Sequence, residues 1–155
     1  MQTVARPAGP LPRLAGAVPA AAARWTSIVA RVIGAGASVG YAIDQSYDRT
    51  QVVTVVVAVV VMLSLLPTGR ATPWLTPFGG WLSALGAGTL LFAGAVLVHE
   101  PLGIVMLLAG LVACAATAVV NHARRVHPLW TTAGVLMSSG LIVLIAVTVA
   151  LAVVG

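Results

Sequence analysis

Five long apolar runs constrain what this chain can fold into more than any other feature. With their flanking residues they approach or exceed the roughly 20 residues that a transmembrane helix needs. Charged residues make up only 7% of the chain, which is too few to cover a water-soluble fold. The sequence therefore predicts an all-α, polytopic membrane bundle with five transmembrane helices, or four if the first run does not cross. The predicted spans are 25–43, 50–67, 80–98, 102–120 and 130–153.

The N-terminal segment 1–24 differs from the rest of the chain. It contains Pro7, Pro10, Pro12 and Pro19, and proline at this density disfavours both helix and β-ladder. We therefore expect a disordered cytoplasmic tail over 1–24 and a helical membrane domain over 25–155. A cleaved signal peptide, formed by Arg13 and the alanine-rich run 14–23, is the alternative.

The second run is rich in valine from Val52 to Val61, a composition that indicates a buried strand in a soluble protein. In lipid, a lone strand would leave its backbone groups unpaired, whereas a helix pairs them internally. We therefore predict a short helix, with Thr50, Gln51 and Pro67 near the membrane interfaces.

The arginines predict the orientation of the bundle, because cytoplasmic loops carry an excess of basic residues. All eight basic residues are arginines. With five crossings and the N-terminus inside, Arg49 alone is outside, and the inner side holds Arg6, Arg13, Arg24, Arg31, Arg70, Arg124 and Arg125. Without the first crossing, the best arrangement places five arginines on one side of the membrane and three on the other. The rule therefore favours five crossings, with the C-terminus outside. The tryptophans agree, since the same inner interface holds Trp25, Trp74, Trp81 and Trp130.

Three arginines are candidate contacts with lipid headgroups or a transported solute. Arg31 is the one charge within a predicted span, where a central charge costs about 2.5–3.5 kcal/mol. Because it follows Trp25 by less than two turns, we expect its long side chain to reach back to the inner headgroups. Arg124 and Arg125 could bind an anionic headgroup or simply anchor the orientation.

Acidic residues and a histidine form further candidates at the predicted outer surface. Asp44 and Asp48 are four residues apart and could hold a cation at a pore mouth, although two exposed acids are ordinary in a loop. His99 and Glu100 could sense pH or supply half of a zinc site. A tight polar turn between two helices explains that pair more simply.

Small residues recur at four-residue spacing, which lets helix backbones approach closely in lipid. The candidate packing positions are Gly36, Gly40, Gly80, Ala84, Gly88, Ala109 and Ala113. We expect them to pack within the chain first, and to form an oligomer interface only as a second use. A chain this rich in alanine and glycine also produces such spacings by chance.

The sequence contains no recognisable catalytic constellation. Ser38 lies in a G-x-S-x-G pattern, but no strand precedes it and the histidines lie in loops. We expect no enzymatic activity, catalytic residue, metal or cofactor. Nucleic-acid binding is not indicated, because the arginines form no basic stripe on a polar domain. No soluble substrate is indicated either.

The leading hypothesis is a non-enzymatic membrane protein that packs against other membrane proteins or itself, as an accessory subunit, assembly factor or small oligomer. The alternative is a small-solute or ion pathway through an oligomer, with Arg31, Asp44 and Asp48 at its ends. An intramembrane lipid-processing enzyme that recruits Ser38, His99 and Glu100 ranks third. Arginine without lysine and an Ala/Val/Gly bias favour the plasma (inner) membrane of a bacterium with a GC-rich genome.

Overall fold

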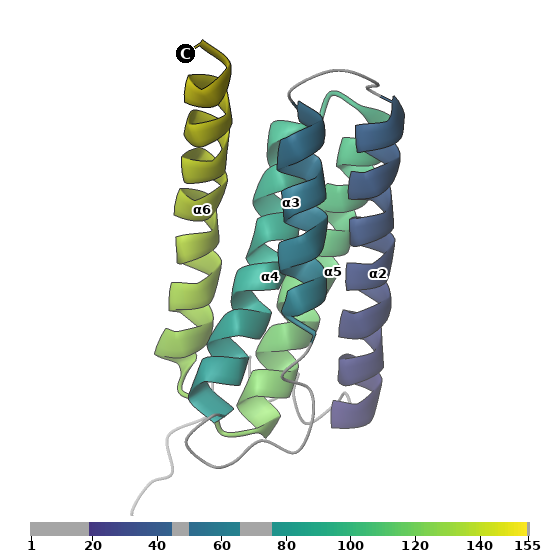
Figure 1. Cartoon of the computed structure of the whole chain (residues 1–155). Helices are drawn as coiled ribbons and strands as arrows, with labels where there is room; N and C mark the ends of the chain where they lie inside the picture. Colours follow the sequence, from purple (N-terminus) through teal and green to yellow (C-terminus); the bar gives the residue numbers. More distant parts are fainter. Residues whose placement is uncertain (1–18, 45–49, 66–75, 155) are drawn as a thin grey trace, which may run out of the picture.

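The helices of this protein form an antiparallel bundle. A computed structural model of the chain describes residues 19–44, 50–65 and 76–154. These residues form five helices and no strand: α2 (Ala20–Asp44), α3 (Thr50–Leu63), α4 (Thr76–Val96), α5 (Pro101–Ala123) and α6 (Pro128–Val154). Consecutive helices run in opposite directions, so the start of α2 and the end of α6 lie at opposite ends of the bundle (Figure 1). The predicted all-α membrane bundle is confirmed, and its orientation stays a prediction.

Four of these helices, α2, α4, α5 and α6, are long and apolar enough to cross a membrane. The fifth, α3, has 14 residues and a length of about 21 Å, so it is short for a bilayer. The helix was predicted to continue to residue 67, but it ends at Leu63. There the amide of Leu65 donates to the carbonyl of Met62, three residues back, which tightens the last turn.

The first helix starts earlier than the sequence predicts. α2 begins at Ala20 rather than Trp25, so the last part of the expected disordered tail is helical. Alanine is the strongest helix former, which explains why Ala20–Ala23 extend the helix outward. Pro19 stands just before this turn and accepts the first hydrogen bond, from the amide of Ala23. The rest of the predicted tail, and the signal-peptide alternative that overlaps it, lie largely outside the described residues.

The core is small and apolar. α2 packs mainly against α5, and α4 lies between α5 and α6, while α3 fills the corner between α2 and α4. The side chains of Val57, Val61, Leu90 and Met106 are fully buried at the centre. α6 contacts the bundle chiefly through α4, and most of its outer surface is exposed.

Glycines set the distance between α4 and α5. A Cβ atom added to Gly110 would lie 2.6 Å from the Cα of Leu91, and one added to Gly94 would lie 2.5 Å from the Cα of Leu107. Backbone atoms cannot move aside as a flexible side chain can. Neither glycine stands among the packing positions proposed from the sequence, although both serve the backbone approach that small residues allow.

The proposed packing positions fall in different environments. Ala84 is fully buried at the α4–α6 contact, where Gly134 of α6 faces it, and Gly88 faces Ser138 of the same helix. Gly80 lies against Val126.

The remaining positions lie on α5 and α2. Ala109 and Ala113 are buried on α5. On α2, Gly40 makes an ordinary contact with Leu102, whereas a Cβ atom on Gly36 would meet nothing within 4 Å.

We expect Gly110→Ala to destabilise the bundle, whereas Gly36→Ala should not. The new methyl group at Gly110 must push apart two backbones, and such overpacking costs about 1–3 kcal/mol. At Gly36 the methyl group has space, so the higher helix propensity of alanine should leave stability equal or slightly raised. Unfolding of the purified variants by SDS in mixed micelles, followed by circular dichroism, measures both effects. Equal stability of the two variants would contradict the close α4–α5 contact.

Candidate functional site

Arg31 is fully buried within the bundle, with 0% of its surface exposed. It lies on the inward face of α2 together with Ser27, Gly34 and Ser38, which are all buried at three- or four-residue spacing. The expected reach of its side chain to the membrane surface is therefore wrong. The guanidinium group turns inward because hydroxyl and carbonyl oxygens from neighbouring helices are available there.

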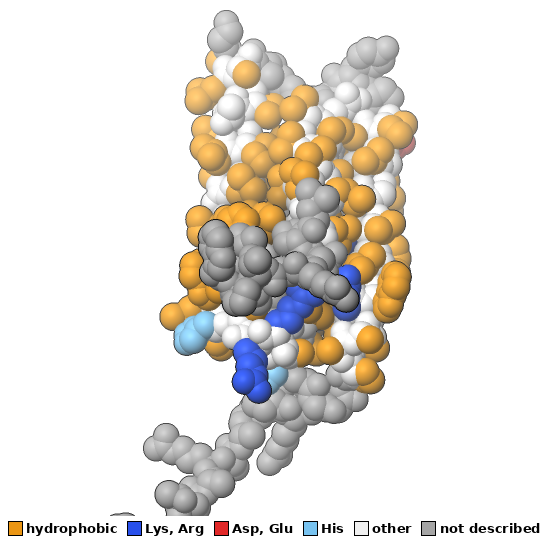
Figure 2. All heavy atoms as spheres, turned by 60° about the horizontal axis from the view of Figure 1, so that its bottom comes forward, with side chains coloured by type: hydrophobic (Ala, Val, Ile, Leu, Met, Phe, Trp, Pro, Cys, Tyr) orange, Lys and Arg blue, Asp and Glu red, His pale blue; other side chains and the backbone are white. Residues whose placement is uncertain are grey.

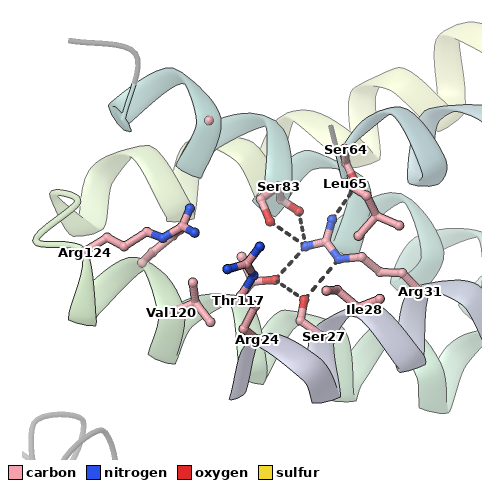
Figure 3. A pocket seen from close by; sticks show the side chains of 12 residues that line it. Arg24, Ser27, Ile28, Arg31, Ser64, Leu65, Ser83, Thr117, Val120 and Arg124 are labelled. Carbon is pink, nitrogen blue, oxygen red and sulfur yellow. Dashed lines mark hydrogen bonds between the residues drawn. The ribbon is translucent and has the colours of Figure 1, made fainter. Parts of the chain in front are cut away.

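The hydrogen bonds of this guanidinium group reach four helices (Figure 3). Nε donates to Ser27 Oγ of the same helix at 3.2 Å, and Nη1 donates to Ser64 Oγ just after α3. Nη2 donates to the carbonyl and hydroxyl oxygens of Ser83 on α4 and to Thr117 Oγ1 on α5, each at 2.7 Å. All these acceptors are neutral, so the positive charge is stabilised without a carboxylate contact in the described part of the chain.

Gly86 makes room for this arrangement. A Cβ atom on Gly86 would collide with the side chain of Ser64 and lie 3.3 Å from Nη1 of Arg31. A larger residue there would displace one of the acceptors. The backbone of α4 can therefore come close to the end of α3 at this level.

We name these side chains, Arg31, Ser27, Ser64, Ser83 and Thr117, the arginine cluster. Sequence reasoning singled out its arginine but missed its serines as partners. The usable signal was the placement of hydroxyl residues within or next to four apolar runs, at a similar depth in each. Ser64, Ser83 and Thr117 are 33, 52 and 86 residues from Arg31, so no local pattern connects them.

A small cavity of about 30 Å³ lies beside the arginine cluster. Its lining includes all five side chains of the cluster, Asn121 of α5, and two further arginines, Arg24 and Arg124. The guanidinium groups of Arg24, Arg31 and Arg124 lie around the same space (Figure 3). Arg124 caps the C-terminal end of α5, where the helix dipole also favours a positive charge.

The cavity lies at the end of the bundle where α2 and α4 begin and α5 ends (Figure 1). Arginine side chains are gathered on this end (Figure 2). The same end carries Arg125, which is exposed and lies outside the cavity lining. Trp25 and Trp130 are also exposed here, as expected for aromatic residues at a membrane interface.

The other predicted polar residues lie at the opposite end. Asp44 is exposed at the last residue of α2, and His99 and Glu100 form the turn between α4 and α5. Asp44 follows Arg31 by thirteen residues, or about 20 Å along the helix, so the two do not form one site. Asp48 lies outside the described residues.

Ser38, the serine of the G-x-S-x-G pattern, is hydrogen-bonded within its own helix. Ser38 donates its hydroxyl hydrogen to the carbonyl of Gly34 on its own helix, at 3.0 Å, and is fully buried. His99 lies in the turn between α4 and α5. Within the described residues, no group of three or more His, Cys, Asp or Glu side chains is close enough to bind a metal ion.

Replacing Arg31 should destabilise the bundle strongly. Arg31→Ala removes the hydrogen bonds that connect four helices and leaves a cavity, so we expect a loss of about 2–5 kcal/mol in the free energy of unfolding. Arg31→Lys should lose part of this, because one ammonium group cannot reach all four helices. SDS unfolding of the purified variants tests both.

The control is Arg125→Gln, since Arg125 is exposed and should change stability by less than about 0.5 kcal/mol. If Arg31→Ala unfolds like this control, the buried hydrogen bonds add nothing net to the stability of the bundle.

Comparison of the chain with protein-family models, with curated proteins and with solved structures found no match. The function is therefore inferred from the residues and geometry of this chain.

Proposed function

We propose that this protein is a small, non-enzymatic integral membrane protein that acts by packing against other membrane proteins, as an accessory or assembly subunit. The observation that carries the proposal is the position of α6 at the edge of the bundle (Figure 1). The four helices joined by the arginine cluster form a fixed core, and α6 takes no part in that cluster. An attached apolar helix with a free side suits a role in helix–helix association.

The second half of α6 has a large exposed apolar surface. Val143, Leu144 and Leu151 are exposed by 61, 62 and 68%. α6 approaches the core closely at Gly134 and Ser138, which contact α4, and its last inward-facing buried residue in the described chain is Ile142. Beyond this point α6 has few neighbours within the chain.

An apolar groove of about 270 Å³ lies where α6 separates from the core. It is lined by residues of α3, of the end of α4 and of α6: Val53, Thr54, Val57, Ala93, Val96, Leu97, Ile142, Val143 and Ala146. Such a lining offers van der Waals contact to an apolar transmembrane helix and nothing to a polar ligand. We propose a transmembrane helix of another protein as its occupant.

The alternative of a solute or ion pathway has less support within one chain. Beyond the arginine cluster, the interior is filled by the side chains of Leu90, Met106 and Val57, which are fully buried. A pathway would therefore have to form between copies of the chain. Self-association of that kind and the bacterial plasma membrane as location stay predictions.

The test compares two tryptophan substitutions on α6. Ala146→Trp fills the groove, whereas Leu144→Trp changes the exposed face of the same helix outside the groove lining. The tagged proteins are extracted with their native lipids, and copurified proteins are quantified by mass spectrometry. We expect one stoichiometric membrane partner with wild type and Leu144→Trp, and at least a tenfold loss of it with Ala146→Trp.

Equal recovery of that partner with both variants would contradict docking in the groove. Absence of any stoichiometric partner, together with ion flux through liposomes that contain the purified protein alone, would replace this proposal by the pathway.

A further inference from the structure

We infer that the cavity beside Arg31 binds a phosphate group. This inference goes beyond packing against partners and does not depend on it, because the cavity and the groove at α6 lie at opposite ends of the bundle. Three observations support it: the charges around the cavity, the hydrogen-bond donors left over within it, and its size and place.

The charges that line the cavity all have one sign. Arg24, Arg31 and Arg124 come from two helices, and no described lining residue is acidic. The described acids Asp44 and Glu100 lie at the other end of the bundle. A buried guanidinium group without a carboxylate is favourable to an anion, and its planar, forked donors suit the oxygens of a phosphate.

Individual hydrogens of the arginine cluster have no acceptor in the described part of the chain, although Nη2 of Arg31 has three acceptors for its two hydrogens. Nη1 of Arg31 carries two hydrogens, and Ser64 accepts one of them; the described residues offer no acceptor for the other. The Ser83 hydroxyl accepts from Arg31, and its own hydrogen likewise has no described acceptor. Ser27 and Thr117 face each other with their hydroxyl oxygens 3.4 Å apart, so one donates to the other and one hydrogen remains. A phosphate oxygen would accept from such donors.

The size and place of the cavity fit the end of a phosphate group. A volume of about 30 Å³ holds one or two water molecules, so phosphate oxygens can enter while the rest of a larger molecule stays outside. α3 ends at Leu63, and Ser64 and Leu65 line the cavity directly after it. These two residues place the cavity in the corner between α2, α4 and α5. Exposed tryptophans mark this end as interfacial, which is the depth of lipid phosphates.

Two sources share this chemistry: the headgroup of an anionic phospholipid and free inorganic phosphate. A lipid would approach from the bilayer at the level of Trp25, with its phosphate between Arg24 and Arg124. Free phosphate would enter from the aqueous phase at the same end of the bundle. The experiment needs one arm for each.

In the first arm, inorganic phosphate is titrated into the full chain in a neutral maltoside detergent, and binding is measured by calorimetry. In the second arm, the same protein receives phosphatidylglycerol in mixed micelles, and retained lipid is counted by native mass spectrometry. We expect saturable binding in at least one arm. Arg124→Gln should weaken it about tenfold, since a hydrogen bond to a charged group is lost.

Arg125→Gln is the matched control, because Arg125 is the next residue, is also exposed and does not line the cavity. It should bind as wild type does, and Arg24→Gln should weaken binding as Arg124→Gln does.

Binding in the first arm identifies free phosphate as a ligand, and binding in the second arm alone identifies the lipid. Equal losses in Arg124→Gln and Arg125→Gln would overturn the inference in favour of a diffuse basic surface. Absence of binding in both arms would also overturn it.

Discussion

The buried guanidinium group of Arg31 organises this bundle, because it can be accommodated in an apolar interior only while four helices supply its acceptors. A charge in a membrane helix costs at most about 2.5–3.5 kcal/mol, the value for the helix centre. A hydrogen bond to a charged group contributes about 1.5–3 kcal/mol, so two or three of the contacts made by Arg31 offset that cost. The structure provides contacts to Ser27, Ser64, Ser83 and Thr117. These contacts fix the positions and directions of the four helices at the level of Arg31.

The polar interaction and the small-residue contacts act at different places. The arginine cluster holds α2, α3, α4 and α5 together near one end, while Gly94 and Gly110 bring α4 and α5 together along their length. α6 is held by close contacts at Ala84, Gly88 and Gly134, by Ile142 in the apolar core, and by the side-chain amide of Asn121, which donates to Thr131 Oγ1. The bundle therefore combines a directional, charged cluster among α2, α3, α4 and α5 with steric contacts and a neutral side-chain hydrogen bond at α6.

The sequence predicts the architecture well, since hydropathy and the need to pair backbone groups in lipid are properties of each helix by itself. All five helices were predicted, and the valine-rich α3 was assigned correctly as a helix. The environment of Arg31 was predicted wrongly, because its acceptors lie up to 86 residues away. Headgroup contact is the natural expectation for one helix, whereas a buried position exists only in the assembled bundle.

The packing positions also separate what one helix determines by itself from what only the assembled bundle determines. Four-residue spacing marks faces on which close approach is possible, but it does not tell which face meets a neighbour. Gly36 carries the pattern and faces open space, whereas Gly110 lies outside the proposed set and contacts the backbone of α4. Only the relative rotation of the helices decides between the two.

The position of Arg31 also has a consequence for the order in which the chain enters the membrane. α2 is synthesised before α4 and α5, which carry the hydroxyl groups of Ser83 and Thr117 that its arginine requires. Until α5 has been made, the guanidinium group of α2 lacks the acceptor that Thr117 supplies. Final burial of α2 is therefore a late step, and an N-terminal fragment that stops before α5 would carry an incompletely paired charge into lipid.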